Sequence, residues 1–478
     1  MAESFVCGGT PSDGHREREQ YALTTGVWPP YRRNGRSVAP FILRAIRIVI
    51  RADSDPVRQA LFAHLKQSHR SVRFVFALHE FLGRTPASAL LVSCYGLAFF
   101  LSIAPPRNRT ARILTVARHA NARRHVGRVA SWLESGVCAA VSTRISVRTG
   151  WSGITTLLRG SSRSSFLRAL RIVRRVDRRH GFLVSCRVAS ALAWYARSRA
   201  ILDAHRADAV LVSSDSNPEE LGFASAARAL DVPTVFVSHA YTTPLSPPLD
   251  FSLSILEGEA AVRARRRKGP IKGEIVLAGL EGDSAPLDTG RFERPDPVIG
   301  LFTPKGVSWP KLVEIVADCR QHFRAREIVI RWHPSMLEEP RLAEWLADTS
   351  GIVESARTAD LTDVAQRCDW VIADENSGVH LPVLKLGIPT IAIKNLGLYP
   401  RSRADLYGFA AEGVVFPPVS SVREVGPHAL AAFFSDGWPA RFQHFDASYL
   451  RPPQAIGSEV RRAIWRLFEP EPAKVTCA

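Results

Sequence analysis

The stretch that most constrains the fold runs from Asp369 to Lys394. Residues 370–373 are a short apolar run, typical of a strand that is covered on both faces. Residues 374–378 (DENSG) carry turn-forming and helix-capping side chains, and an apolar helical pattern follows until Gly387. Residues 390–393 form a second apolar strand. The stretch therefore predicts a strand, loop, helix and strand in succession, the unit from which parallel α/β sheets are built.

The loop at 374–378 is a candidate anion-binding site. A loop between a strand's C-terminal end and a helix offers free backbone N–H groups and a favourable helix dipole. Ser377 adds a hydroxyl donor beside the N–H groups near Gly378. Another apolar strand ends at Arg331 and is followed by His333. We expect Arg331 and His333 to share a strand face, and the two strand ends to be neighbours that bind one anion.

These two stretches together resemble the C-terminal half of GT-B glycosyltransferases. The shared pattern is a strand ending in His-Pro, then a strand–Asp–x–x–Ser–Gly–helix–Gly–x–Pro segment. The nearest families by motif are bacterial capsule and surface-carbohydrate glycosyltransferases and the CDP-glycerol glycerophosphotransferases of wall polymers. The resemblance implies two doubly wound Rossmann-like domains facing a cleft. It also implies transfer of a sugar, or a sugar-like phosphate unit, from a nucleotide-activated donor to a surface-polysaccharide or lipid-linked acceptor.

The whole chain predicts an α/β fold in three parts. Residues 1–110 are expected to form an N-terminal extension with a poorly ordered start, then basic and apolar helices. In residues 111–292 strand and helix patterns alternate, which predicts a doubly wound parallel sheet and an acceptor domain. Residues 293–478 contain the organising stretch and form the nucleotide-donor domain. Their last elements are expected to be a strand at 414–416 and a helix at 458–467.

Polar residues follow two strands of the region 111–292. Asp215 follows the strand at 209–213, and His239 follows the strand at 233–237. In the families that the chain resembles, a His-Gly pair at this place lies at the domain cleft, whereas Ala240 stands here for the glycine. The resemblance therefore makes His239 the expected general base for the acceptor hydroxyl. Asp215 is either an alternate base or a cap of the following helix.

Transfer from a nucleotide donor requires electrostatic stabilisation of the leaving phosphate, a base, and substrates held together. The residues expected to bind the donor phosphate are His333, Ser377, Gly378, Lys305 and Arg331. Those expected near the donor sugar or ribose are Glu375 and Asn376. No Asp-x-Asp cluster of the other main glycosyltransferase fold is evident, so we expect no metal and no cofactor besides the donor substrate. Most relatives with a histidine base invert, which predicts an inverting enzyme.

Two alternative functions remain open. The non-hydrolysing UDP-GlcNAc 2-epimerases share the GT-B fold and a Ser-Gly-Gly-x-x-Glu-Glu signature. When that signature is aligned on Ser377, its two glutamates fall on Pro382 and Val383, which counts against an epimerase. The other alternative is a non-catalytic subunit that binds a sugar nucleotide or a polysaccharide.

The charge of the chain favours anionic partners. Lys and Arg number 63 and Asp and Glu 45, for a net charge of +18. No nucleic-acid-binding motif is present, so phosphate-bearing substrates and acidic lipid are the expected partners. The uncharged run 87–104 is either a buried or interfacial helix or a single membrane span. The cationic run 263–268 is either a solvated face or a contact for lipid head groups or pyrophosphate.

The seven cysteines are scattered without a CxxC pair, which favours reduced thiols in the cytoplasm. We therefore expect a cytoplasmic protein that is peripheral at the inner membrane face.

Overall fold

The computed structural model of the chain describes most residues from Ala39 onward. The described residues are 39–53, 70–83, 85–108, 110–143, 172, 173, 175, 176, 179–243, 246–280, 284–304, 306–334, 345, 351–355, 359–398, 405–435 and 437–468. Among the features predicted from the sequence, Lys305, the start of the chain and most of the helix expected at 342–347 lie outside them.

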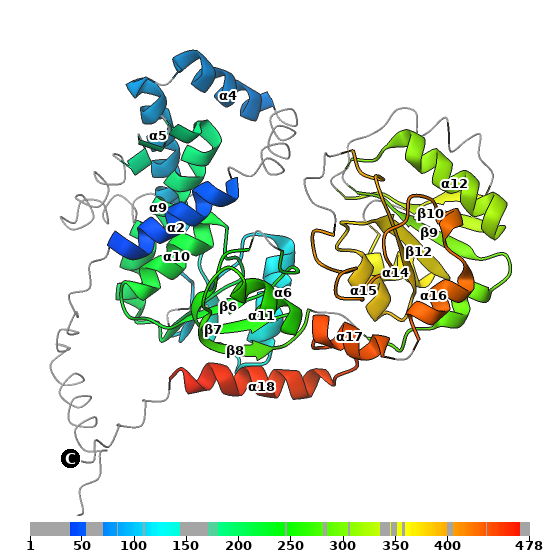
Figure 1. Cartoon of the computed structure of the whole chain (residues 1–478). Helices are drawn as coiled ribbons and strands as arrows, with labels where there is room; N and C mark the ends of the chain where they lie inside the picture. Colours follow the sequence, from blue (N-terminus) through cyan, green and yellow to red (C-terminus); the bar gives the residue numbers. More distant parts are fainter. Residues whose placement is uncertain are drawn as a thin grey trace, which may run out of the picture. The chain divides into compact units, whose positions relative to one another are not determined.

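The first of two parallel sheets has the order β3-β2-β5-β6-β7-β8 in the described part of the chain. Its strands β6, β7 and β8 are labelled in Figure 1. Every neighbouring pair in it is parallel. β2, β5 and β6 are buried throughout, as expected for parallel strands covered on both faces. The strands are β2 (Ile113–Val116), β3 (Cys138–Ala140), β5 (Ala209–Val212), β6 (Thr234–Val237), β7 (Asp250–Leu256) and β8 (Lys272–Leu277).

Helices alternate with these strands, as right-handed crossovers require. They are α6 (Ala120–Ser131), α9 (Phe182–His205), α10 (Pro218–Arg228) and α11 (Glu259–Arg266). The apolar and Arg-rich pattern over 164–200 predicts one long helix, whereas Gly181 separates α9 from helical residues before it, which are 172, 173, 175, 176, 179 and 180 in the described part of the chain. Gly181 has a φ of 80°, a left-handed conformation that interrupts a helix.

The second sheet has the order β11-β10-β9-β12-β13 among the described residues, again with parallel pairs throughout. Its strands are β9 (Val298–Phe302), β10 (Glu327–Arg331), β11 (Ile352–Glu354), β12 (Trp370–Asp374) and β13 (Thr390–Ile393). Its helices are α12 (Trp309–Phe323), α14 (Leu361–Gln366), α15 (His380–Lys385), α16 (Pro427–Phe433) and α17 (Trp438–Phe445). The predicted fold class, α/β with two doubly wound parallel sheets, is confirmed; the cleft between them remains a prediction.

The last strand expected, at 414–416, does not form. Val414 and Val415 are buried in the core without joining the sheet. Pro417 and Pro418 follow and cannot donate ladder hydrogen bonds, which explains why the apolar run is not a strand. Only Val419 pairs with the sheet, in a single parallel bridge to Ile393.

The C-terminal helix α18 (Pro453–Arg466) belongs to the first sheet and not to the second. Its buried side chains share one hydrophobic cluster with the strands of the first sheet: Ile456, Val460, Ala463 and Ile464. The helix expected at 458–467 is present and starts five residues earlier. The domain built on the first sheet is therefore made of two stretches that are far apart in sequence.

Among the described residues, three helices precede the first sheet: α2 (Ala39–Asp53), α4 (Arg70–Leu82) and α5 (Pro86–Ser102). α2 packs against α9 and α10, and α5 packs along α9. Helices α2 and α5 of the expected N-terminal extension therefore pack against helices of the first sheet. Among the helices that the structure describes, none has the combination of length and apolar character needed to cross a bilayer.

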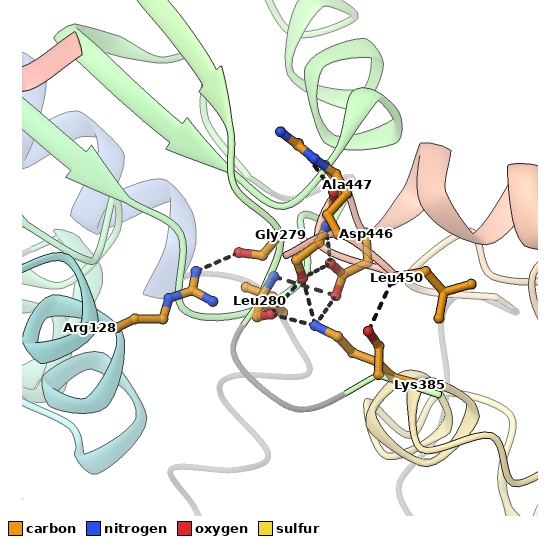
Figure 2. Close-up of polar contacts among 10 residues, drawn as sticks. Arg128, Gly279, Leu280, Lys385, Asp446, Ala447 and Leu450 are labelled. Atoms are coloured by element: carbon orange, nitrogen blue, oxygen red, sulfur yellow. Dashed lines mark hydrogen bonds and ion pairs between the residues drawn. The ribbon is translucent and has the colours of Figure 1, made fainter. Parts of the chain in front are cut away.

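A buried ion pair lies where the chain connects the two sheets (Figure 2). Lys385, the last residue of α15, donates to the carbonyl of Leu280 at 2.7 Å and to Ser448 Oγ at 2.6 Å. Its Nζ is 3.5 Å from Asp446 Oδ2. Asp446 in turn accepts the N–H of Ser448 at 3.0 Å and its hydroxyl at 2.6 Å. Both connecting segments are thereby bonded to α15.

Candidate functional site

The order of the first sheet reverses between β2 and β5. Ligands of open α/β sheets bind beyond the carboxyl ends of the strands at such a reversal. His119 follows β2, Asp215 follows β5, and His239 follows β6, which pairs with β5. The structure thus brings His119, which sequence reasoning missed, to the edge that carries His239. Strand order would have revealed it, and strand order is not visible in a single sequence.

The imidazole of His239 has a defined tautomer. Its Nδ1 contacts the backbone carbonyl of Ser213, and the ring is half-buried. A carbonyl oxygen only accepts hydrogen bonds, so Nδ1 carries the proton. In the neutral ring Nε2 then has a free lone pair. This is the state that a general base requires.

Acidic and basic groups surround this histidine edge. Arg118 pairs with Glu219 through its guanidinium and donates its backbone N–H to Glu220 Oε1 at 3.2 Å. Burial raises the pKa of Glu220 to about 8. Burial, with the nearby charges of Arg118 and His239, lowers the pKa of His119. The site therefore favours the neutral form of the His119 imidazole.

Asp215 faces a different partner from the one expected of a base. Its carboxylate pairs with Arg265, which is buried and also donates to the carbonyl of Pro247 at 2.7 Å. The capping alternative for Asp215 is wrong, because Ser214 Oγ accepts the N–H of Asn217 at 3.0 Å at the start of α10. The same ion pair means that the cationic run 263–268 is not simply a solvated face.

The second sheet reverses between β9 and β12, which places the loops at 303–306 and 375–378 at its candidate ligand edge. The expectation that the His333 and Ser377 strands are neighbours is wrong, because β9 lies between β10 and β12. At about 4.8 Å per strand, the two strand ends are roughly 10 Å apart. His333 and the Ser377 turn therefore lie on opposite sides of the end of β9.

Ser377 lies in a tight turn. Its N–H donates to the carbonyl of Asp374 at 2.8 Å, and its hydroxyl accepts the N–H of Val379 at 3.4 Å. Helix α15 begins only at His380. The hydroxyl hydrogen of Ser377 is not used by either bond, so it remains a possible donor to an anion.

The two residues expected near the donor sugar have structural partners. Asn376 accepts the N–H of Leu406 at 2.6 Å, which ties the turn to the loop at 405–409. Glu375 is buried, and burial raises the pKa of its carboxyl. The tied loop brings in Tyr407, whose hydroxyl is 3.9 Å from the position a Cβ on Gly378 would take. Tyr407 could not be placed beside the turn from the sequence, because α15 and β13 come between them along the chain.

Arg331 and His333 lie on either side of the fully buried Trp332 and are themselves half-buried. Arg331 donates to the carbonyl of Ala359 at 3.5 Å, and burial lowers its pKa. The N–H of His333 donates to Thr303 Oγ1 at 3.3 Å, so His333 is held beside the end of β9.

An aromatic contact links the two candidate edges. Tyr241, two residues beyond His239, packs edge-on against Tyr407 with ring centroids 6.3 Å apart. It also packs against Phe409 at 5.6 Å, and burial raises its pKa. Tyr407 stacks on Phe409 at 5.0 Å. The loop that carries His239 and the turn that carries Gly378 therefore share Tyr407 as a common neighbour.

No protein-family model matches the sequence, and no curated protein sequence matches it. Among solved structures, the chain is similar to the UDP-GlcNAc 2-epimerase of Neisseria meningitidis bound to UDP-GlcNAc (TM-score 0.40, 11% identity, 74% of this chain and 99% of that chain). It is also similar to the calicheamicin glycosyltransferase CalG4 (0.43, 11%, 74% and 99%) and to MurG of Acinetobacter baumannii (0.39, 10%, 74% and 99%).

Proposed function

We propose that the protein is a GT-B glycosyltransferase. It moves a sugar, or a sugar-like phosphate unit, from a nucleotide-activated donor to a surface-polysaccharide or lipid-linked acceptor. The observation that carries the proposal is the contact of Tyr241 with Tyr407, because it joins a histidine with a free Nε2 to the turn containing Ser377 and Gly378. Such a reaction needs its base and its leaving-group site within reach of the same substrates.

In the proposed reaction, Nε2 of His239 accepts the proton of the acceptor hydroxyl. The acceptor oxygen bonds to the anomeric carbon of the donor sugar as the bond from that carbon to the phosphate oxygen breaks. The electron pair leaves with the nucleotide, whose new negative charge is stabilised by Ser377, the N–H groups near Gly378, and His333. Attack from the face opposite the leaving group inverts the anomeric centre, and no metal enters the scheme.

The ion pair of Asp215 with Arg265 supports His239 over Asp215 as the base. Positions 382 and 383 are Pro and Val, where the epimerase signature has two glutamates. This difference supports a transferase over an epimerase. The net charge of +18 supports an acceptor or surface rich in phosphate, such as a lipid-linked glycan at the inner face of a membrane.

The base is tested by His239→Ala. We expect turnover to fall by roughly 10²–10⁴-fold with donor affinity near wild type, because proton transfer is lost and the donor contacts remain. The donor is first identified by thermal shift with a panel of nucleotide sugars. Glycosyl transfer is then measured, with and without EDTA, as the amount of nucleoside diphosphate or monophosphate that is released.

His428→Ala is the matched control, since His428 is an exposed histidine on α16. Turnover of His239→Ala within a few-fold of wild type on the true acceptor would remove His239 from the mechanism. Interconversion of a donor with its C2 epimer, without any acceptor, would favour the epimerase alternative instead.

A further inference from the structure

Exposed apolar side chains are found on α4 and α5, the two neighbouring helices labelled in Figure 1. Phe74 and Phe81 of α4 are 67% and 87% exposed, and Leu90 and Tyr95 of α5 are 65% and 39% exposed. We call these four side chains the α4–α5 surface. Large apolar side chains gathered on neighbouring elements mark an interaction site more often than a chance exposure.

The outward face of α5 is apolar along its length. Residues 86–102 contain no charged side chain. One face packs on α9, where Gly96 approaches Ala189 so closely that a Cβ on Gly96 would lie 3.1 Å from the Ala189 Cβ. Leu90, Cys94 and Ala98, spaced four apart, are exposed on another face. Within the described residues, the rest of the protein therefore covers α5 on one side only.

Helix α4 extends this apolar face. Phe74 and Phe81 are seven residues apart, which is two helical turns, so they project from the same side of α4. A short turn joins α4 to α5, with Gly83 at a φ of 60° and Thr85 Oγ1 donating to the carbonyl of Leu82 at 2.8 Å. The two helices also pack against each other.

Positive charge accompanies the apolar face. Leu43, Arg47 and Arg51 are exposed on α2, and their spacing of four places them in one stripe. Arg107, five residues after α5, is exposed as well. A group of helices that exposes both apolar or aromatic and basic side chains is typical of proteins that lie in the interface of anionic membranes.

We propose that the α4–α5 surface inserts into the head-group region of an anionic lipid bilayer, with α5 lying along the membrane plane and the basic stripe of α2 contacting lipid phosphate. The charge complementarity selects lipid over a second copy of this chain, which carries the same positive charge. The inference rests on the proposed function in one respect only: if the acceptor is lipid-linked, this surface brings the protein to the membrane that contains the acceptor.

The test is flotation of the full chain with vesicles of phosphatidylcholine alone or mixed with phosphatidylglycerol. Wild-type protein should float with the mixed vesicles and be released by high salt, because screening shortens the reach of the arginines. The combined variant Phe74→Ser, Phe81→Ser and Leu90→Ser should bind mixed vesicles at least about tenfold more weakly. The matched control is Leu398→Ser, since Leu398 is also 65% exposed but lies on the second-sheet domain.

Equal vesicle binding by the triple variant and wild type, or no binding by wild type at low salt, would overturn the proposal. A wild-type dimer that the triple variant dissociates, without lipid binding, would identify a second copy as the occupant and would also overturn it. Retained thermal stability and nucleotide-induced thermal shift show that the variant is folded. Flotation needs no nucleotide, so its result can be interpreted even if the protein proves not to be a glycosyltransferase. In the same way, a failure to bind vesicles does not contradict the glycosyltransferase proposal.

Discussion

At the scale of single residues, the separation of His333 from Ser377 by β9 leads to a quantitative expectation. We expect Ser377→Ala and His333→Ala each to weaken nucleotide-donor binding by about 1.5–3 kcal/mol, the value of a hydrogen bond to a charged group. Since the strand ends are roughly 10 Å apart, the two losses should add in the double variant. Isothermal calorimetry with the identified donor measures all three affinities.

Ser458→Ala, at an exposed position of α18, serves as the serine control for that experiment. If the double variant binds the donor with the same affinity as the weaker-binding single variant, His333 and Ser377 act on one group of the donor. Unchanged affinity in both single variants would remove them from the donor site.

The buried His380 makes stability depend on pH. Its Nε2 contacts the carbonyl of Asp374 at 3.0 Å and its Nδ1 contacts Thr390 Oγ1 at 3.1 Å, and burial lowers its pKa from 6.5 to about 3. The unfolded chain therefore binds one more proton at this residue between those pH values. The free energy of unfolding should fall as pH falls below about 6.5, with a slope of up to about 1.4 kcal/mol per pH unit from His380 alone.

His380→Gln removes this titration while keeping a donor and an acceptor. Denaturant unfolding at pH 7 and pH 5 should show a smaller loss in His380→Gln than in wild type. His428→Gln, exposed on α16, should behave like wild type. An identical pH slope in His380→Gln would show that other groups, such as the buried His125, account for the whole effect.

The site residues that could be predicted from the sequence share one property: each directly follows an apolar run that forms a strand. His239 and Ser377 follow apolar runs that are unmistakable in the sequence, so their places after β6 and β12 could be predicted. His119 and Tyr407 could not, because their proximity to those residues depends on strand order and on a loop tied by Asn376. Asp215 was assigned two roles, and an arginine fifty residues away occupies its carboxylate.

At the scale of elements, α15 is bonded to both connections through Lys385. Lys385→Met leaves Asp446 buried without its cation, and such a loss is typically worth about 3–5 kcal/mol. We expect a markedly lower thermal midpoint for Lys385→Met, with partial recovery in Lys385→Met combined with Asp446→Asn, which removes the orphaned charge. The thermal midpoints of the two single variants and the double variant form the cycle that checks this.

Lys311→Met is the control for that cycle, because Lys311 pairs at the surface with Glu314, and such pairs contribute about 0–1 kcal/mol. A thermal midpoint of Lys385→Met equal to that of Lys311→Met would contradict the assignment of Lys385 as a structural cation.

Element types followed from the sequence wherever the hydrophobic pattern was local and long enough. Strands β5, β6, β10, β12 and β13 are present close to the places that their apolar runs predict. The errors have separate physical causes: Pro417 and Pro418 prevent a strand after 414, and Gly181 interrupts the helix expected over 164–200. The neighbour relation of β10 and β12 depends on β9 entering between them, which no local pattern encodes.

At the scale of the whole molecule, α18 completes the core of the first sheet. Ile464 is fully buried there, so Ile464→Ala should destabilise the protein by about 2–5 kcal/mol through lost burial and the resulting cavity. Arg462→Ala, on the exposed side of the same helix, should change stability by less than about 0.5 kcal/mol. Chemical denaturation of both variants measures the difference.

A shift of unfolding midpoint confined to Ile464→Ala supports the assignment of α18 to the first sheet. Equal midpoints for the two variants would mean that α18 does not contribute to that core in solution.

The return of α18 to the first sheet also sets an order of events during synthesis. A ribosome synthesises β2 to β8 long before it reaches residues 453–466. Until α18 has been made, the apolar side chains that it covers in the first domain are exposed to solvent. Gly457 lies on the buried side of α18, where a Cβ would come within 2.6 Å of the Trp132 ring, so the late helix must dock with little tolerance. Ribosome-stalled chains ending before residue 453 should therefore recruit holdase chaperones that full-length chains do not.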